Sequence, residues 1–103
     1  MALPDKNSIL KTLAEHHRQL ESYGVKQIGL FGSYVHGEAT ENSDIDLLVD
    51  INKEQKTFRN FMSLCYYLEE LFHQKVELVT LQSLSPYIGP HILKTVEYAT
   101  FPD

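Results

Sequence analysis

The stretch from Asp44 to Ile51 alternates cleanly between two kinds of side chain, and this alternation restricts the fold more than any other feature of the sequence. One set is Ile45, Leu47, Val49 and Ile51, and the other is Asp44, Asp46, Leu48 and Asp50. Because successive side chains of a strand point to opposite faces, the pattern predicts a β-strand with one apolar face and one face that carries carboxylates. The apolar face must be covered, which calls for helices packed on a sheet.

Two more strands and three helices are predicted from the remaining sequence. Short apolar runs predict strands over residues 25–31 and 76–81. Apolar residues at helical spacing predict helices over residues 5–23, 57–73 and from Ser85 towards Val96, the last delayed or kinked by Gly89-Pro90. The polar segment 34–43 has room for one helical turn and a loop, whereas residues 98–103 carry no prediction.

The order helix, strand, strand, helix, strand, helix predicts the fold class. We expect an α/β (α+β) protein with one small mixed β-sheet and helices packed on it. A chain of 103 residues is the size of one domain, so the prediction is a single domain over residues 1–103.

Composition limits the classes of binding partner and the cellular compartment that we expect for this chain. Nine Lys and Arg against 14 Asp and Glu give a formal charge of -5, which disfavours a protein that binds nucleic-acid phosphates through a basic surface. No apolar run approaches the roughly 18 residues of a membrane span, and the first residues do not resemble a secretion signal. The single cysteine, Cys65, lies among apolar residues. We therefore expect a cytoplasmic protein with a reduced, buried thiol and no membrane partner.

Asp44 and Asp46 are the first candidates for chemistry. Two residues apart on a strand, they leave the same face roughly 6.6 Å from each other at about 3.3 Å per residue. Like charges at about 7 Å repel by on the order of 2 kcal/mol at an effective dielectric near 20, and a divalent cation would remove that cost. Oxygen ligands alone point to Mg²⁺ or Mn²⁺. The alternative is a pair of acidic residues on a solvated strand face.

The turn at Gly32-Ser33 suits an anion. Gly32 has no Cβ, so a phosphate can approach the backbone where the first strand ends, and Ser33 adds a hydroxyl beside free N–H groups. A Gly-Ser pair is also found in ordinary turns.

Glu77 offers a third carboxylate. If the strand over 76–81 lies beside the strand that begins at Asp44, Glu77 approaches both aspartates and either completes a metal site or takes a proton from an attacking hydroxyl. A solvent-facing strand glutamate is the alternative. Asp50, roughly 13 Å beyond Asp46, is too far to share one metal and is predicted to be a surface residue. Apart from His36, the chain has four histidines without metal-like spacing. They are predicted to lie on helix surfaces or at helix ends, and are His16, His17, His73 and His91.

Gly32-Ser33 followed by Ser43-Asp44-Ile45-Asp46 resembles the signature of the polymerase-β-like nucleotidyltransferases. With Gly37-Glu38-Ala39, the sequence from about Val25 to Val96 resembles the minimal nucleotidyltransferase family. The resemblance implies a palm-like mixed sheet and two Mg²⁺ ions held by Asp44, Asp46 and a third acidic residue at Glu77. It also implies an NTP, here ATP, with phosphates on Gly32-Ser33, and with His36 and Ser43 as further nucleotide-binding positions.

Two positions depart from that family pattern. Members commonly carry arginine where His36 stands, and often aspartate where Glu77 stands. Histidine is a weaker phosphate partner than the permanently charged arginine fork, and glutamate is one methylene longer than aspartate.

The resemblance also implies a partner. Many family members pair with a HEPN-domain toxin and act as its antitoxin, some by transferring AMP onto it. The leading hypothesis is therefore an Mg²⁺-dependent nucleotidyltransferase that moves AMP from ATP to a hydroxyl, such as a tyrosine of a HEPN toxin. The alternative is a non-catalytic module that masks the toxin in a stoichiometric complex. Transfer onto RNA or a small molecule suits the chemistry but not the composition. For either leading role we expect exposed aromatic side chains among Phe58, Tyr66, Tyr67 and Tyr98.

Overall fold

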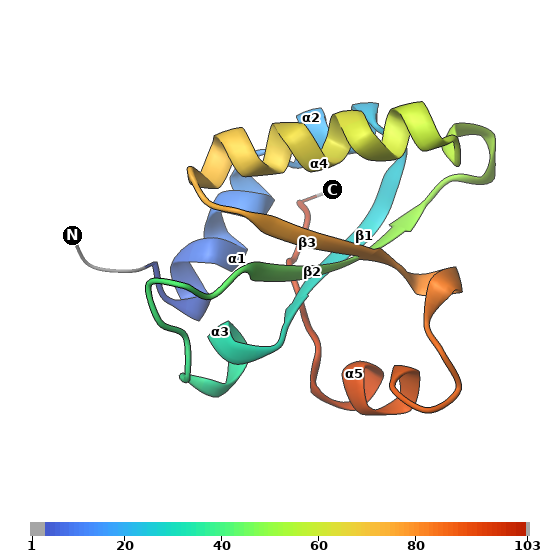
Figure 1. The fold of residues 1–103 in the computed structure, drawn as a ribbon. Helices are drawn as coiled ribbons and strands as arrows, with labels where there is room; N and C mark the ends of the chain where they lie inside the picture. Colours follow the sequence, from blue (N-terminus) through green and yellow to red (C-terminus); the bar gives the residue numbers. More distant parts are fainter. Residues whose placement is uncertain (1–3, 103) are drawn as a thin grey trace.

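The fold is built on one mixed sheet of four strands in the order β3-β2-β1-β4 (Figure 1). The computed structural model describes residues 4–102; residues 1–3 and 103, the ends of the predicted domain, lie outside the described residues. The strands are β1 (Val25–Phe31), β2 (Ile45–Ile51), β3 (Val76–Thr80) and β4 (Glu97–Tyr98). β1 is antiparallel to both β2 and β4, whereas β2 and β3 are parallel, which confirms the predicted mixed sheet.

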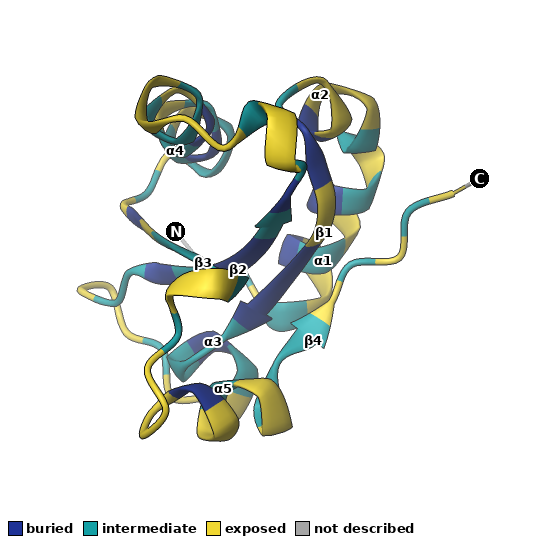
Figure 2. Ribbon diagram, turned by 90° about the vertical axis from the view of Figure 1, so that its right-hand side faces the viewer, coloured by how far each residue is buried: buried dark blue, intermediate teal, exposed yellow. Residues whose placement is uncertain are grey.

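One face of this sheet is buried under helices. α1 (Lys6–Glu15), α2 (His17–Ser22) and α4 (Phe58–Phe72) cover it (Figures 1 and 2). The alternating apolar residues of β2 join one core with helix residues, namely Ile45, Leu47, Val49 and Ile51 with Ile9, Leu13, Leu20, Leu64 and Leu68. Each of these side chains is at most 3% exposed, so the apolar face predicted for this strand is confirmed.

The helix predicted over residues 5–23 is two helices, so the single-helix prediction was wrong at its centre. His16 separates α1 from α2 with φ -105° and ψ 23°, outside helical values. Its ring Nδ1 lies 2.8 Å from the carbonyl oxygen of Thr12, so the side chain competes for a helical acceptor. The interruption leaves Leu13 and Leu20, on either side of it, fully buried.

α4 connects the two parallel strands. It begins after Thr57, whose Oγ1 accepts a hydrogen bond from the Asn60 N–H at 3.1 Å, and it ends at His73 in a left-handed conformation with φ 52°. Parallel neighbours need such a crossover, because a tight hairpin can join only antiparallel strands. The helix predicted over 57–73 is therefore confirmed to within one residue at each end.

The opposite face of the sheet is covered by fewer and shorter helices. α5 (Gly89–Thr95) lies on the side away from α4, and the one-turn helix α3 (Ser33–His36) follows β1 (Figures 1 and 2). The helix predicted from Ser85 begins four residues late, as Gly89-Pro90 led us to expect. Ser85 Oγ instead accepts the Ile88 N–H at 3.0 Å and stabilises the preceding turn.

The C-terminal segment, which carried no prediction, supplies a strand. Glu97 and Tyr98 of β4 pair with Leu30 and Gly29 of β1, and the Glu97 carboxylate forms an ion pair with Lys6 Nζ at 3.0 Å. This pairing holds α5 under the sheet, because only Val96 separates the helix from the strand. Within residues 4–102, no helix combines the length and the apolar character needed to cross a membrane.

Candidate active site

The three predicted carboxylates lie where β1 ends and β2 and β3 begin. In the antiparallel pair, Phe31 lies opposite Asp46, and in the parallel pair Asp46 lies opposite Glu77. Asp44 immediately precedes β2. The structure thus brings Glu77 beside the aspartates from a segment about thirty residues away, as the strand pairing considered above requires.

The electrostatics of this cluster centre on Asp46. Burial raises the pKa of the Asp46 carboxyl from 3.8 to about 7, and the raised value also reflects a hydrogen bond with Glu77 and repulsion from Glu77 and Asp44. Burial is the largest cause, because it disfavours the charged form.

Gly32 makes room for Asp46. It has φ 79° and ψ -151°, and a Cβ built on it would overlap Asp46 Oδ2 and lie 3.0 Å from Asp46 Cγ. The Gly32 carbonyl then accepts the N–H groups of Val35 and His36 as α3 begins. Only glycine fits this turn, because it tolerates positive φ and has no side chain to displace the carboxylate.

The carboxylates of Asp44, Asp46 and Glu77 are the type of ligand that a divalent cation such as Mg²⁺ binds. Three carboxylates supply hard oxygen ligands, and a cation would relieve the repulsion that Glu77 and Asp44 exert on Asp46. As the side chains lie, however, no group of three or more His, Cys, Asp or Glu residues in the part of the chain described is gathered closely enough to hold a metal ion.

A cavity of about 330 Å³ lies next to the Gly32 turn. Phe31, Gly32, Ser33, His36 and Glu38 line one side, and His91, Ile92 and Thr95 of α5 line the other. Three of the four residues predicted to bind the nucleotide thus border one space. The fourth, Ser43, is not among its lining residues, and its Oγ accepts the Thr40 N–H at 2.9 Å within the loop before β2.

His91 is exposed in the first turn of α5, so its prediction as a helix-surface or helix-end residue is confirmed. Sequence reasoning did not anticipate that it also lines the same cavity as His36. No local pattern around His91 signals this position, because it depends on the pairing of β4 with β1.

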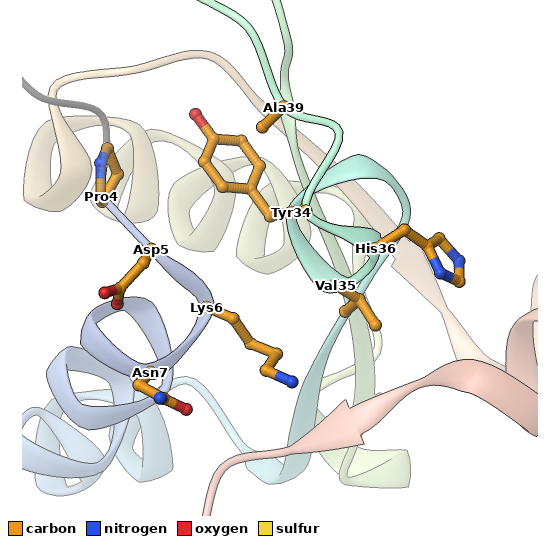
Figure 3. Close-up of a pocket in the computed structure, with 9 residues that line it drawn as sticks. Pro4, Asp5, Lys6, Asn7, Tyr34, Val35, His36 and Ala39 are labelled. Atoms are coloured by element: carbon orange, nitrogen blue, oxygen red, sulfur yellow. The ribbon is translucent and has the colours of Figure 1, made fainter.

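A larger cavity of about 490 Å³ lies away from the carboxylates, between the start of α1 and α3 (Figure 3). The Lys6 side chain extends past Val35 of α3 there, and its Nζ pairs with Glu97 of β4 at 3.0 Å. His36 also lines this cavity, but its ring points away from Lys6. Asp44, Asp46 and Glu77 do not line it. The smaller cavity is the better candidate for a substrate, because it contains the Gly32 turn against which Asp46 packs.

Cys65 and Asp50 lie outside this site. The Cys65 thiol is half-buried rather than fully buried, and burial, followed by the charge of Glu69, raises its pKa. Its Sγ lies 3.9 Å from the Val76 carbonyl oxygen. Asp50, predicted to be a surface residue, accepts a hydrogen bond from Gln82 Nε2 at 3.1 Å.

Comparisons with known proteins relate the fold and the site to one group. Residues 10–100 match the family model of the nucleotidyltransferase domain. The chain is 42% identical over 99 residues to the protein adenylyltransferase MntA of Thermococcus cleftensis, covering 95% of this chain and 99% of that protein. Among solved structures it is similar to a minimal nucleotidyltransferase, with a TM-score of 0.79 and 26% identity over 94% of this chain and 98% of the other.

A second solved structure shows the same fold. It is the complex of the tri-AMPylated HEPN toxin of Shewanella oneidensis with the MNT antitoxin. One chain of this complex matches with a TM-score of 0.60 and 22% identity. The match covers 94% of this chain and 70% of that one.

Proposed function

This chain belongs to the nucleotidyltransferase domain family, among its MntA-like protein adenylyltransferases, and from that membership we propose that it transfers AMP from ATP to a hydroxyl group of a partner protein. The acceptor is a tyrosine of a HEPN-domain toxin, and the transfer makes the chain its antitoxin. The AMPylated HEPN toxin in a structural neighbour supports this choice of acceptor.

The observation that carries the proposal is the register that places Glu77 beside Asp46 next to the Gly32 turn. In the transfer, the hydroxyl oxygen bonds to the α-phosphorus, the bond from that phosphorus to the oxygen of the β-phosphate breaks, and pyrophosphate leaves. The hydroxyl proton passes to the Glu77 carboxylate. Glu77 is exposed on an edge strand, so a side chain from another protein can reach it.

The other residues hold and orient the nucleotide. Ser33 and His36 bind the phosphates beside the Gly32 turn. Because Gly32 has no side chain, a phosphate can come close to the backbone there, and backbone N–H groups can donate hydrogen bonds to its oxygens. Asp44 and Asp46, with Glu77, would hold Mg²⁺, or Mn²⁺ in its place. When bound, these ions neutralise the negative charge that develops on the phosphoryl group.

Exposed aromatic side chains support a protein partner. Phe58 is 81% exposed, Tyr66 is 62% exposed and Tyr98 is 36% exposed, as predicted. Tyr67 is half-buried, with its ring centroid 5.6 Å from that of Tyr23, so it contributes less to a free surface.

The intact mass of the partner tests the proposal. The chain is incubated with Mg²⁺, ATP and a HEPN-domain toxin that forms a complex with it, and we expect one or more AMP increments on that toxin. Asp46→Asn should abolish the increment and leave complex formation intact. Asp50→Asn, which removes a carboxylate from the same strand face outside the site, should leave it unchanged. An inactive toxin with no increment would instead establish stoichiometric masking.

A further inference from the structure

The cavity beside the Gly32 turn has a histidine on each of two walls. His36 comes from the end of α3 and His91 from the first turn of α5, and both side chains are exposed. Among residues 4–102 the one ion pair joins Lys6 to Glu97, so neither imidazole is held by a carboxylate. Both histidines are therefore available to a ligand that enters the cavity.

Among the described residues that line these walls, the two imidazoles are the only basic groups. No lysine or arginine lines the cavity, and Glu38 is its one carboxylate. Each imidazole offers an N–H donor that suits a phosphate oxygen, whereas the Glu38 carboxylate repels it. The side chains that attract an anion thus come from both walls, and α5 contributes one of them.

The position of Asp46 orients a nucleotide in this space. The α-phosphorus must lie near the carboxylates for transfer, and Asp46 packs directly against Gly32. From Gly32 the cavity extends to α5, and Asp44, Asp46 and Glu77 do not line it. The part of the triphosphate that departs as pyrophosphate can therefore extend from these carboxylates past Gly32 into this cavity.

We propose that His91 binds the β- and γ-phosphates of ATP from the wall opposite His36, and so distinguishes ATP from AMP. This inference rests on the proposed function, because it assigns the nucleotide to this cavity. His91 acts on the leaving group through hydrogen bonds from its ring, while His36 and Ser33 hold the other side.

Equilibrium binding of ATP and AMP, each with Mg²⁺, tests this assignment. His91→Asn should weaken ATP binding about five- to tenfold and change AMP binding less than twofold, because AMP lacks the two phosphates. His91→Gln, which keeps an amide donor on a longer side chain, should lie between the parent and His91→Asn. Glu38→Gln should strengthen ATP binding, because it removes the carboxylate from the same cavity.

His73→Asn is the matched control. It makes the same chemical change at an exposed histidine outside this cavity, at the end of α4, and its φ of 52° is one that asparagine tolerates. We expect no change in the binding of either nucleotide. Circular dichroism should show the parent melting temperature for His91→Asn, because the side chain is exposed.

The outcomes separate this inference from the proposed function. If the parent binds ATP and His91→Asn binds it equally well, the assignment of His91 is wrong and the proposed function stands. An equal loss for ATP and AMP also overturns the assignment, because it places His91 against the adenosine or in the packing of α5. If the parent binds no ATP, the proposed function and the inference both fail.

Discussion

Gly32 and Asp46 pack so closely that a Cβ at position 32 would overlap the Oδ2 atom of Asp46. The glycine immediately follows β1, whose last residue, Phe31, pairs with Asp46 on β2. The turn that borders the cavity lined by His36 and His91 is therefore one packing unit with the carboxylate cluster, and a change in the turn displaces the carboxylate.

Gly32→Ala should remove AMP transfer. The new methyl group displaces Asp46, and the combination of φ 79° with ψ -151° lies in a region essentially restricted to glycine, which adds strain of about 1–3 kcal/mol for a residue with a side chain. We expect the transfer rate to fall at least tenfold and the melting temperature to fall by several degrees. Gly37→Ala is the control, because Gly37 has a similar φ of 72° but open space around its Cβ position. Equal losses of activity in both variants would contradict the prediction.

The stability of the metal-free protein should fall as pH rises from about 4 to about 7. The folded-state pKa of Asp46 is raised from 3.8 to about 7, so over this window the folded protein binds more protons than the unfolded chain. Asp46 is only half-buried, so solvent screening reduces the effect to on the order of 1 kcal/mol. Thermal melts in EDTA should show a shift of about 4–8 °C.

Two variants check the source of this pH dependence. Asp46→Asn should flatten the profile, because it removes the titrating group. Asp50→Asn should keep the parent profile, since Asp50 lies at the far end of β2. A profile unchanged in Asp46→Asn would place the titration elsewhere.

Divalent cations should stabilise the fold through the aspartates. Mg²⁺ or Mn²⁺ together with ATP at 100 times the dissociation constant stabilises a protein by about 2.7 kcal/mol, and the melting temperature rises accordingly. In the double variant Asp44→Asn with Asp46→Asn, the cation-dependent part of this rise should vanish. An equal rise in parent and double variant would refute the carboxylates as ligands.

Asn60→Ala should destabilise the protein without touching the site. Asn60 Nδ2 donates to the carbonyl oxygens of Tyr23 at 2.7 Å and Gln55 at 2.9 Å, and so ties the turn before β1 to the segment before α4. Loss of both bonds should cost about 1–3 kcal/mol by chemical denaturation. Asn7→Ala, at an exposed position, should stay within about 0.5 kcal/mol of the parent. Nucleotide binding should be unchanged in both.

The strands that form the site could be predicted because their signals are local. The alternation after Asp44 fixes which residues of β2 face the core, and the apolar run before Gly32 marks β1. The polymerase-β-like palm implied by the motif is confirmed by the likeness to the solved minimal nucleotidyltransferase. The approach of Glu77 to Asp46 could be anticipated only as one option, because strand order is not encoded in either strand alone.

The features that were missed have two different causes. One is local: the His16 ring Nδ1 lies 2.8 Å from the Thr12 carbonyl oxygen, which also accepts the His16 backbone N–H at 3.1 Å, and hydrophobic periodicity does not report such a contact. The other is distant: Glu97 and Tyr98 form too short a strand to leave a pattern, and their pairing with β1 is what carries His91 to the cavity. Tertiary geometry decides only this second case.

The edge position of β3 bears on how the enzyme holds its third carboxylate. β3 has one neighbouring strand, whereas β1 and β2 each have two. Edge segments open locally at lower free energy than central strands, so amide hydrogen exchange should be faster over Val76–Thr80 than over β2. Such an opening separates Glu77 from Asp46 while β1 and β2 stay paired. Fraying of this one strand can therefore separate and rejoin the two carboxylates, with no need for global unfolding.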